Sequence, residues 1–203
     1  MSAASLVLVK HALPVLDATK PAKEWQLSAE GELQSRRLAG RLRAFVPLRL
    51  VASPEPKALR TAELVGAELG VRVSPIDGLR EFDRPILPHL SKPDYERANA
   101  QIFLDPSRRV LGNESGQEAL DRFSTAIETA LAGTDAQTLV AITHGTVIAL
   151  FAADHNGVDA FDLWKRLECT SFVVLELPAF ASRCGDRCER LLKRRAGRTL
   201  RAS

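Results

Sequence analysis

Two of the four histidines in this 203-residue chain directly follow short apolar runs. The run "LVLV" ends at Val9 and leads into Lys10 and His11, and the run "LVAIT" ends at Thr143, which precedes His144. Runs of this length and composition are typical of buried β-strands, so we expect each histidine just beyond the end of a strand. An imidazole can act as a nucleophile or as a general acid and base near neutral pH, so the two histidines form a candidate reaction centre.

Other polar side chains follow the remaining predicted strands. The segment "LRLVAS" at 48–53 ends with Ser53 and is followed by Lys57, and Glu81 comes shortly after the next strand. Because ligands of α/β proteins bind at the carboxyl ends of the strands, we expect these side chains to lie near the histidines. Cations and imidazoles that converge at one place favour an anion such as phosphate. A helix predicted at 54–69 would add backbone N–H groups and the positive end of its dipole.

The chain alternates between apolar runs and amphipathic helices. The predicted strands are 5–9, 48–53, 71–76, 138–143 and 171–177. The predicted helices are 28–45, 54–69 and 116–132. Continuous apolar strands separated by helices predict an α/β fold, in which a mostly parallel central sheet lies between two helical layers in a three-layer α/β/α sandwich.

Local signals support these helices. Ser28 and Ser53 are predicted N-caps, and Pro54 is expected at the first helical position. Ser115 and Glu118 form an S-x-x-E capping box at the start of the third helix. The segment 82–114, which is rich in proline and mixed in polarity, predicts a long excursion over one end of the sheet that could bind substrate.

Composition places limits on the class of protein. The chain is 45% hydrophobic and 26% charged, which is ordinary for a globular protein, and no apolar run approaches the ~20 residues of a membrane helix. The first apolar run lacks a preceding basic region, so we expect no signal peptide, no membrane association and a cytoplasmic location. Three cysteines do not indicate a disulfide framework. No spacing of ligand-type residues indicates a metal, and no cofactor is expected.

The positive charge of the chain lies in its last residues. From Arg183 onward, eight Lys and Arg residues stand against Asp186 and Glu189, whereas the net charge of the entire chain is only +3. We therefore predict one domain over 1–180 and a basic tail over 181–203 that is suited to an acidic partner. The tail has no aromatic residue to stack on bases, which disfavours nucleic acid. No pattern indicates an oligomeric state.

Six segments, in order along the chain, resemble the motifs of the histidine phosphatase superfamily, which is also called phosphoglycerate mutase-like. They are "LVLVKHALP", "LSAEGELQSRRLAGRL", "VASPEPKALRTAELVGAELG", "LREF", "NESGQEALDRF" and "LVAITHGTVIAL". The resemblance implies the fold of that family and a hydrolase of phosphomonoesters that needs no cofactor. A mutase that returns the phosphoryl group to its substrate and a binding-only regulatory domain are the alternatives.

The resemblance also implies roles for individual residues. His11 would be the nucleophile that becomes phosphohistidine, His144 the second histidine and Glu81 the acid and base, with Asp83 as a rival proton donor. Lys10 and Lys57 stand where the family has phosphate-binding arginines, so charge is kept but the planar fork of arginine is lost. The family's serine–proline turn begins here at Ser53, which the resemblance places among the phosphate-binding residues, and Arg60 could substitute in part for the missing arginine. Lys10, Lys57 and a protonated His144 would stabilise the charge of the transferring phosphoryl group.

Overall fold

The computed structural model describes residues 5–84, 91–110, 112–132, 138–176 and 201–202. The strands are β1 (Ser5–Lys10), β2 (Leu48–Ala52), β3 (Val73–Pro75), β4 (Thr138–Thr143), β5 (Phe172–Glu176) and β6 (Arg201–Ala202). The α-helices are α1 (Ala29–Leu42), α2 (Pro56–Leu69), α3 (Lys92–Leu104), α4 (Gly116–Ala132), α5 (Gly145–Asn156) and α6 (Ala160–Arg166). Short 3-10 turns lie at Ala22–Glu24, Arg43–Phe45 and Asp77–Leu79.

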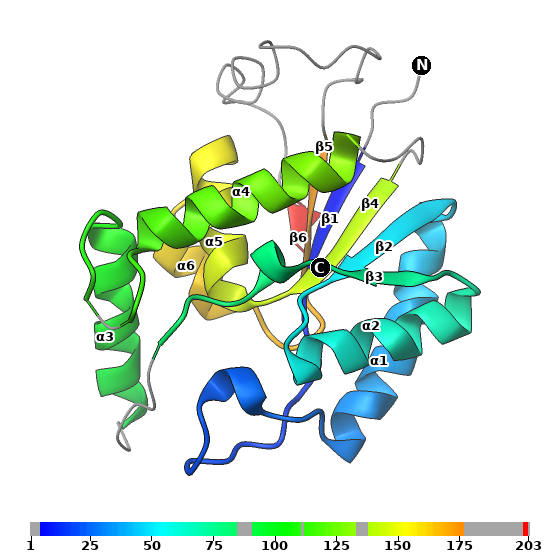
Figure 1. The fold of residues 1–203 in the computed structure, drawn as a ribbon, viewed down its shortest axis with the longest axis horizontal. Helices are drawn as coiled ribbons and strands as arrows, with labels where there is room; N and C mark the ends of the chain where they lie inside the picture. The colour runs from blue at the N-terminus through cyan, green and yellow to red at the C-terminus, as the bar shows by residue number, and fades with distance from the viewer. Residues whose placement is uncertain (1–4, 85–90, 111, 133–137, 177–200, 203) are drawn as a thin grey trace.

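One sheet with the strand order β3-β2-β4-β1-β5-β6 forms the middle of the molecule (Figure 1). The neighbours β3, β2, β4 and β1 run parallel, whereas β5 is antiparallel to β1 and β6 is antiparallel to β5. The predicted three-layer α/β/α sandwich with a mostly parallel sheet is therefore confirmed. Each of the five predicted strands corresponds to one of β1 to β5.

Each face of the sheet is covered by its own helices and its own core. Leu6 and Leu8 of β1 pack into a core with residues of α4 and α5, and the alternate residues Val7 and Val9 pack into a second core with α1 and α2. Figure 1 shows these two helix pairs on opposite sides of the strands. This division explains why the strands read as continuous apolar runs, because every residue of a doubly covered strand faces a core.

The helix starts agree with the sequence signals at two places and differ at a third. Ser28 accepts the N–H of Gly31 at the start of α1, and the capping box at the start of α4 is made by reciprocal bonds from the Glu118 N–H to Ser115 Oγ (3.1 Å) and from the Ser115 N–H to Glu118 Oε2 (2.6 Å).

The prediction for α2 was wrong by two residues, because α2 begins at Pro56 and Ser53 is not its cap. The Ser53 N–H instead donates to the carbonyl of Ile142 at 2.9 Å and so continues the ladder between β2 and β4. Glu55 takes the N-cap position, and no side-chain bond caps this helix. The Oγ of Ser53 accepts the N–H of Glu55 within the turn at 3.2 Å and also contacts a residue outside it.

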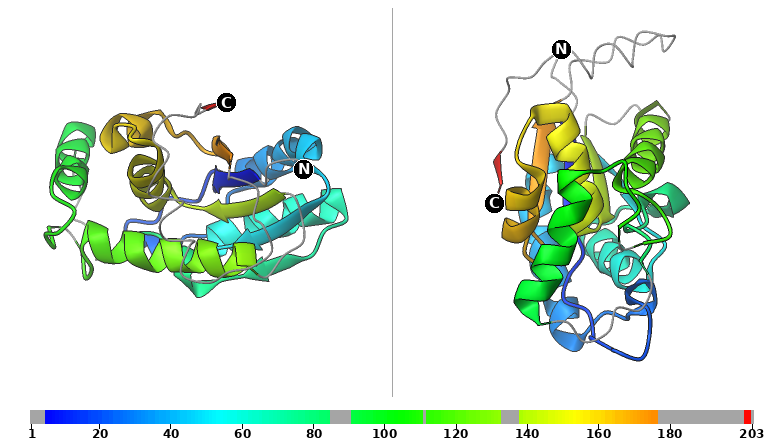
Figure 2. Two further views of the ribbon diagram at one scale, coloured as in Figure 1. Left: turned by 90° about the horizontal axis from the view of Figure 1, so that it is seen from above. Right: turned by 90° about the vertical axis from the view of Figure 1, so that its left-hand side faces the viewer.

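The excursion after Glu81 contains a helix that the sequence analysis did not predict. Helix α3 begins after Ser91, whose Oγ accepts the N–H of Asp94, and a proline lies in its first turn. A serine cap followed by proline is an ordinary helix start, so the signal was present. Figure 2 shows α3 at one end of the molecule, beyond α6.

The predicted basic tail lies largely outside the described residues. Only Arg201 and Ala202 are described, and they pair with Val174 and Val173 of β5. The division into a domain over 1–180 and a tail over 181–203 remains a prediction. No helix within the described ranges is both long and apolar enough to cross a membrane.

Candidate active site

Three parallel strands end in register and bring both histidines to one edge of the sheet. Lys10 of β1 is opposite Thr143 of β4, and the N–H of the next residue, His11, donates to the Thr143 carbonyl at 2.9 Å. The imidazole rings of His11 and His144 lie with their centroids 5.1 Å apart, inclined by 62°. The two residues are 7% and 0% exposed. The expected meeting of the histidines is therefore present in the structure.

The ring of His11 is oriented by a backbone carbonyl. Its Nδ1 lies 2.8 Å from the carbonyl oxygen of Ala12, and because a carbonyl can only accept, Nδ1 must carry the proton. Burial, the neighbouring His144 and the charge of Lys57 hold the pKa of His11 well below 6.5. The imidazole is thus neutral at neutral pH, and its lone pair is on Nε2. A neutral imidazole with a free Nε2 is the form that can attack an electrophile.

His144 is enclosed more completely. Its Nε2 lies 2.9 Å from Ser53 Oγ and 3.6 Å from Glu55 Oε1. Its Nδ1 is buried and has no hydrogen-bond partner among the described residues. Burial and then Lys57 lower the pKa of His144 to about 3. The expectation of a protonated His144 is therefore not met in this structure, since desolvation and a nearby ammonium both disfavour a second positive charge.

Glu81 lies at the N-terminus of α5, the helix that begins directly after His144. Its Oε2 accepts the N–H of Thr146 at 3.1 Å, and its Oε1 accepts the N–H groups of Phe82 at 2.8 Å and Val147 at 3.3 Å. The first N–H groups of a helix have no partner within the helix and bind a carboxylate well. Glu81 and His144 are therefore coupled through the start of one helix.

The backbone around Glu81 is held by Arg122 of α4. The guanidinium donates to the carbonyls of Gly78 (2.8 Å), Arg80 (3.0 Å) and Glu81 (3.2 Å), and it pairs with Glu114 at 2.7 Å. Because this single side chain binds three backbone carbonyls of the loop, the position of the Glu81 carboxylate depends on α4. Arg122 is therefore a structural ion-pair partner of Glu114.

Lys57 lies on the α2 side of the histidines and is 4% exposed. Its Nζ donates to the carbonyl of Ala22 at 2.7 Å and to Oε2 of Glu55 at 2.6 Å. The other oxygen of Glu55, Oε1, accepts the N–H of Glu81 at 2.8 Å. Glu55 was missed by the sequence analysis, in which the residue appeared only as part of a helix start. A carboxylate two residues before the lysine was visible, but its burial was not.

Lys10 approaches from the opposite side of the sheet. Its Nζ donates to the carbonyl of Leu167, which follows α6, at 2.7 Å. A Cβ built on Gly145 would lie 3.6 Å from Lys10 Nζ and equally far from Trp164 Cδ1, so the lysine runs beside the residue after His144. Lys10 lowers the pKa of His11 less than Lys57 does. Both predicted lysines thus lie near the histidines, with Lys57 the more strongly coupled of the two.

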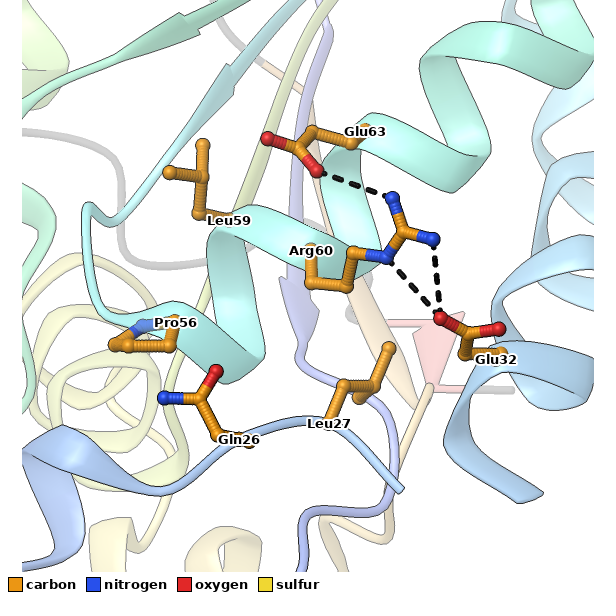
Figure 3. A pocket seen from close by; sticks show the side chains of 7 residues that line it. All are labelled: Gln26, Leu27, Glu32, Pro56, Leu59, Arg60 and Glu63. Atoms are coloured by element: carbon orange, nitrogen blue, oxygen red, sulfur yellow. Dashed lines mark hydrogen bonds and ion pairs between the residues drawn. The ribbon is translucent and has the colours of Figure 1, made fainter. Parts of the chain in front are cut away.

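The structure does not bring Arg60 to this cluster. Its side chain is 48% exposed and pairs with Glu32 of α1 at 3.0 Å and with Glu63 of α2 at 3.4 Å. These groups line an open pocket of about 370 Å³ on the outer surface, together with Gln26, Leu27, Pro56 and Leu59 (Figure 3). A guanidinium already held by two carboxylates is poorly placed to replace a phosphate-binding arginine.

Two residues that follow Glu81 have different surroundings. The carboxylate of Asp83 accepts from Asn113 at 3.0 Å and from Lys23 at 3.3 Å, and these contacts, Asn113 first, lower its pKa. Asp83 is therefore a poor proton donor. Arg84, which the sequence analysis did not single out, donates to Thr146 Oγ1 at 3.0 Å and to Asn99 Oδ1 at 2.7 Å. It thereby joins this loop to α3 and α5 beside His144.

The cluster contains imidazoles, ammonium groups and carboxylates, and its His and Glu side chains are of types that can bind metals but are not gathered into a metal site among the described residues. Within the described parts of the chain, no three His, Cys, Asp or Glu side chains come together in a way that could hold an ion. The donor set instead suits an anion, since cationic and N–H groups surround two neutral imidazoles.

The chain has a clear sequence relationship to one superfamily. The profile of the histidine phosphatase superfamily (branch 1) matches residues 6–184. Among curated proteins, the probable phosphoglycerate mutase GpmB of Salmonella paratyphi A is 25% identical over 140 residues, which cover 66% of this chain. The aligned part spans only 65% of the length of that relative.

Solved structures share the fold. A mycobacterial glucosyl-3-phosphoglycerate phosphatase superposes with a TM-score of 0.69 at 21% identity, covering 85% of this chain and 89% of the other. The α-ribazole phosphatase of Shigella flexneri superposes with a TM-score of 0.64 at 19% identity, covering 85% and 90%. With the profile match over most of its length and the same fold, the chain belongs to the histidine phosphatase superfamily.

Proposed function

We propose that this protein is a phosphomonoester hydrolase in which His11 becomes phosphohistidine. The observation that carries the proposal is the state of the His11 ring, which is buried, neutral and fixed by Ala12 with its Nε2 lone pair available. Superfamily membership and the named activities of the two structural relatives support the same reaction class.

In the first step, Nε2 of His11 attacks phosphorus, a P–N bond forms, and the P–O bond to the organic group breaks. The leaving oxygen takes a proton from the acid form of Glu81. Lys57 and Lys10 stabilise the charge on the phosphoryl oxygens, where positioning and electrostatics supply most of the rate. Ser53 holds the ring of His144 beside the phosphoryl group.

In the second step, water attacks the phosphohistidine and gives a proton to Glu81. The P–N bond breaks, inorganic phosphate is released, and His11 returns to its neutral form. The N–H groups of α5 that bind the Glu81 carboxylate keep it beside His144 for this proton transfer. The reaction as written needs no metal and no cofactor.

The proposed substrate is a small phosphorylated molecule, as the names of the relatives indicate for those proteins. Its organic group would lie towards Arg84, which bonds both Thr146 at the start of α5 and Asn99 of α3. A cytoplasmic location and an acidic partner for the tail at 181–203 are proposed from composition and charge.

The test is hydrolysis of an aryl phosphate, followed as free phosphate, together with a search for acid-labile, base-stable phosphate on the protein. We expect turnover and a labelled histidine, both lost in His11→Ala. His155→Ala is the matched control, because His155 bonds to Phe151 at the far end of α5 and should leave both signals unchanged. Full activity in H11A would refute the central assignment.

The same assay separates the alternatives. A mutase would transfer phosphate to 3-phosphoglycerate with little free phosphate released, and that result would overturn the hydrolase proposal in favour of a transferase. A binding-only protein would bind phosphate and show neither turnover nor a labelled histidine.

A further inference from the structure

The turn between β2 and α2 holds a buried carboxylate that the reaction described above does not use. Glu55 is 7% exposed, and both of its oxygens have partners. Oε2 receives a bond from Lys57 Nζ at 2.6 Å, and Oε1 receives one from the Glu81 N–H at 2.8 Å. Burial of a carboxylate is costly unless it is paired, so this arrangement must be specifically compensated.

Glu55 lies among the groups that would bind phosphate. Its Oε1 is 3.6 Å from Nε2 of His144. Its Oε2 contacts the ammonium of Lys57, which is the largest cause of the lowered pKa of His144 apart from burial. Because His11 and His144 are neutral, Lys57 is the main cation on the α2 side of the pair. The charge of Glu55 offsets that cation at close range.

An incoming phosphoryl group must compete with Glu55 for Lys57. An ammonium has three N–H donors, and two of those on Lys57 already serve Glu55 and the Ala22 carbonyl. Phosphate can accept the third, but its negative charge then lies beside a carboxylate in a dry site, where like charges repel strongly. The Ala22 contact is neutral, so it fixes Lys57 without weakening its attraction for an anion.

We propose that Glu55 is a positioning residue that acts through Lys57 and keeps the affinity of the site for phosphate low. This inference rests on the proposed function and assigns to Glu55 the release of the second product, inorganic phosphate. A site with two unopposed lysines would hold that product more tightly. Glu55 sets the balance between capture of the ester and release of phosphate.

The test is the dissociation constant of inorganic phosphate, measured by isothermal titration calorimetry at pH 7.5. We expect Glu55→Gln to bind phosphate about tenfold more tightly, because glutamine keeps an acceptor for the Glu81 N–H and removes the charge beside Lys57. Glu55→Asp, whose shorter side chain retreats from Lys57, should tighten binding by a smaller factor. Glu63→Gln is the matched control, because Glu63 lies on the exposed side of α2 and pairs with Arg60. This change should leave the dissociation constant of phosphate unchanged.

Two results would overturn the proposal. The first is unchanged or weaker phosphate binding in folded E55Q and E55D, which a purely structural role for Glu55 predicts. The second is equal tightening when E55Q is introduced into a Lys57→Met background, which would mean that the effect does not pass through Lys57. The dissociation constant of phosphate can be measured without turnover. A failure to form phosphohistidine would therefore reject the proposed hydrolysis but would not affect this test of Glu55.

Discussion

Helix α2 carries two cations three residues apart, and they have opposite settings. Lys57 is buried and pairs with Glu55 beside the two histidines, whereas Arg60 is half exposed and pairs with Glu32 and Glu63 in the open surface pocket. From residue type alone, arginine is the better phosphate ligand, because its planar fork binds two oxygens at once. The structure assigns the position near the histidines to the lysine.

The contrast teaches that burial, more than residue type, decides what a charge can do. In a dry setting the field of Lys57 reaches both imidazoles and lowers the pKa of each. The Arg60 pairs lie in water, where screening reduces such interactions to small values. The same chemical pair, a cation beside a glutamate, therefore acts on the candidate site where it is buried and has little effect where water surrounds it.

The largest expected difference between substitutions of Lys57 and of Arg60 is in turnover. Lys57→Met should lower kcat/KM for an aryl phosphate by about 100-fold or more, because a preorganised charge partner of the phosphoryl oxygens is lost. Arg60→Met, the matched change on the same helix, should alter kcat/KM by less than about twofold. An equal loss in R60M would show that Arg60 reaches the substrate after all.

The second difference is in stability. Lys57→Met leaves Glu55 buried without its cation, so we expect the free energy of unfolding to fall by about 3–5 kcal/mol in urea titrations. Arg60→Met should cost about 1 kcal/mol or less, as exposed pairs do. The double variant E55Q/K57M should recover part of the loss, and a double variant no more stable than K57M would argue against an unpaired carboxylate as the cause.

The third difference is in the pH dependence of activity. His11 must be neutral to attack, and burial, His144 and Lys57 lower its pKa, so activity should persist below pH 6.5 before it falls. Without the Lys57 charge the imidazole protonates more readily, and the acid limb of kcat/KM should move to higher pH in K57M. R60M should keep the wild-type limb. If the acid limb of K57M moved to lower pH instead, Lys57 would not be lowering the pKa of His11.

The smallest effect is expected at Lys10. Lys10→Arg keeps the charge and restores a planar fork, so turnover should stay the same or rise by a few-fold. Steady-state kinetics with an aryl phosphate measure this. Lys10 Nζ bonds the Leu167 carbonyl, and a collapse of activity would mean that the pocket is built around this lysine and does not accept a guanidinium.

The features that could be predicted from the sequence are those that depend on residues close together in the chain. Apolar runs identified β1 to β5, and a histidine beyond each of two parallel strands was enough to predict that the rings of His11 and His144 would meet. The capping box at Ser115 was equally local, because its two bonds join residues three apart. Such features depend on neighbouring residues or on the register of one sheet.

The rest depended on tertiary contacts that a sequence does not display. Helix α2 begins two residues later than predicted because Ser53 bonds to Ile142 of β4, which is far away in the chain. Arg60 faces away because α1 supplies Glu32, and Glu55 became important because α2, Ala22 and the Glu81 loop bury it together. Helix α3 had an ordinary start signal, which the surrounding prolines concealed.

The strand order has a consequence for behaviour at high concentration. An exposed strand edge is a template for pairing with another chain and hence for aggregation. One edge here is β3, which is only three residues long and ends in Pro75, a residue without an N–H to donate. At the other edge, β6 pairs with Val173 and Val174 of β5. Arg201 and Ala202 thus occupy the part of this edge at Val173 and Val174, where a strand of a second molecule would otherwise pair.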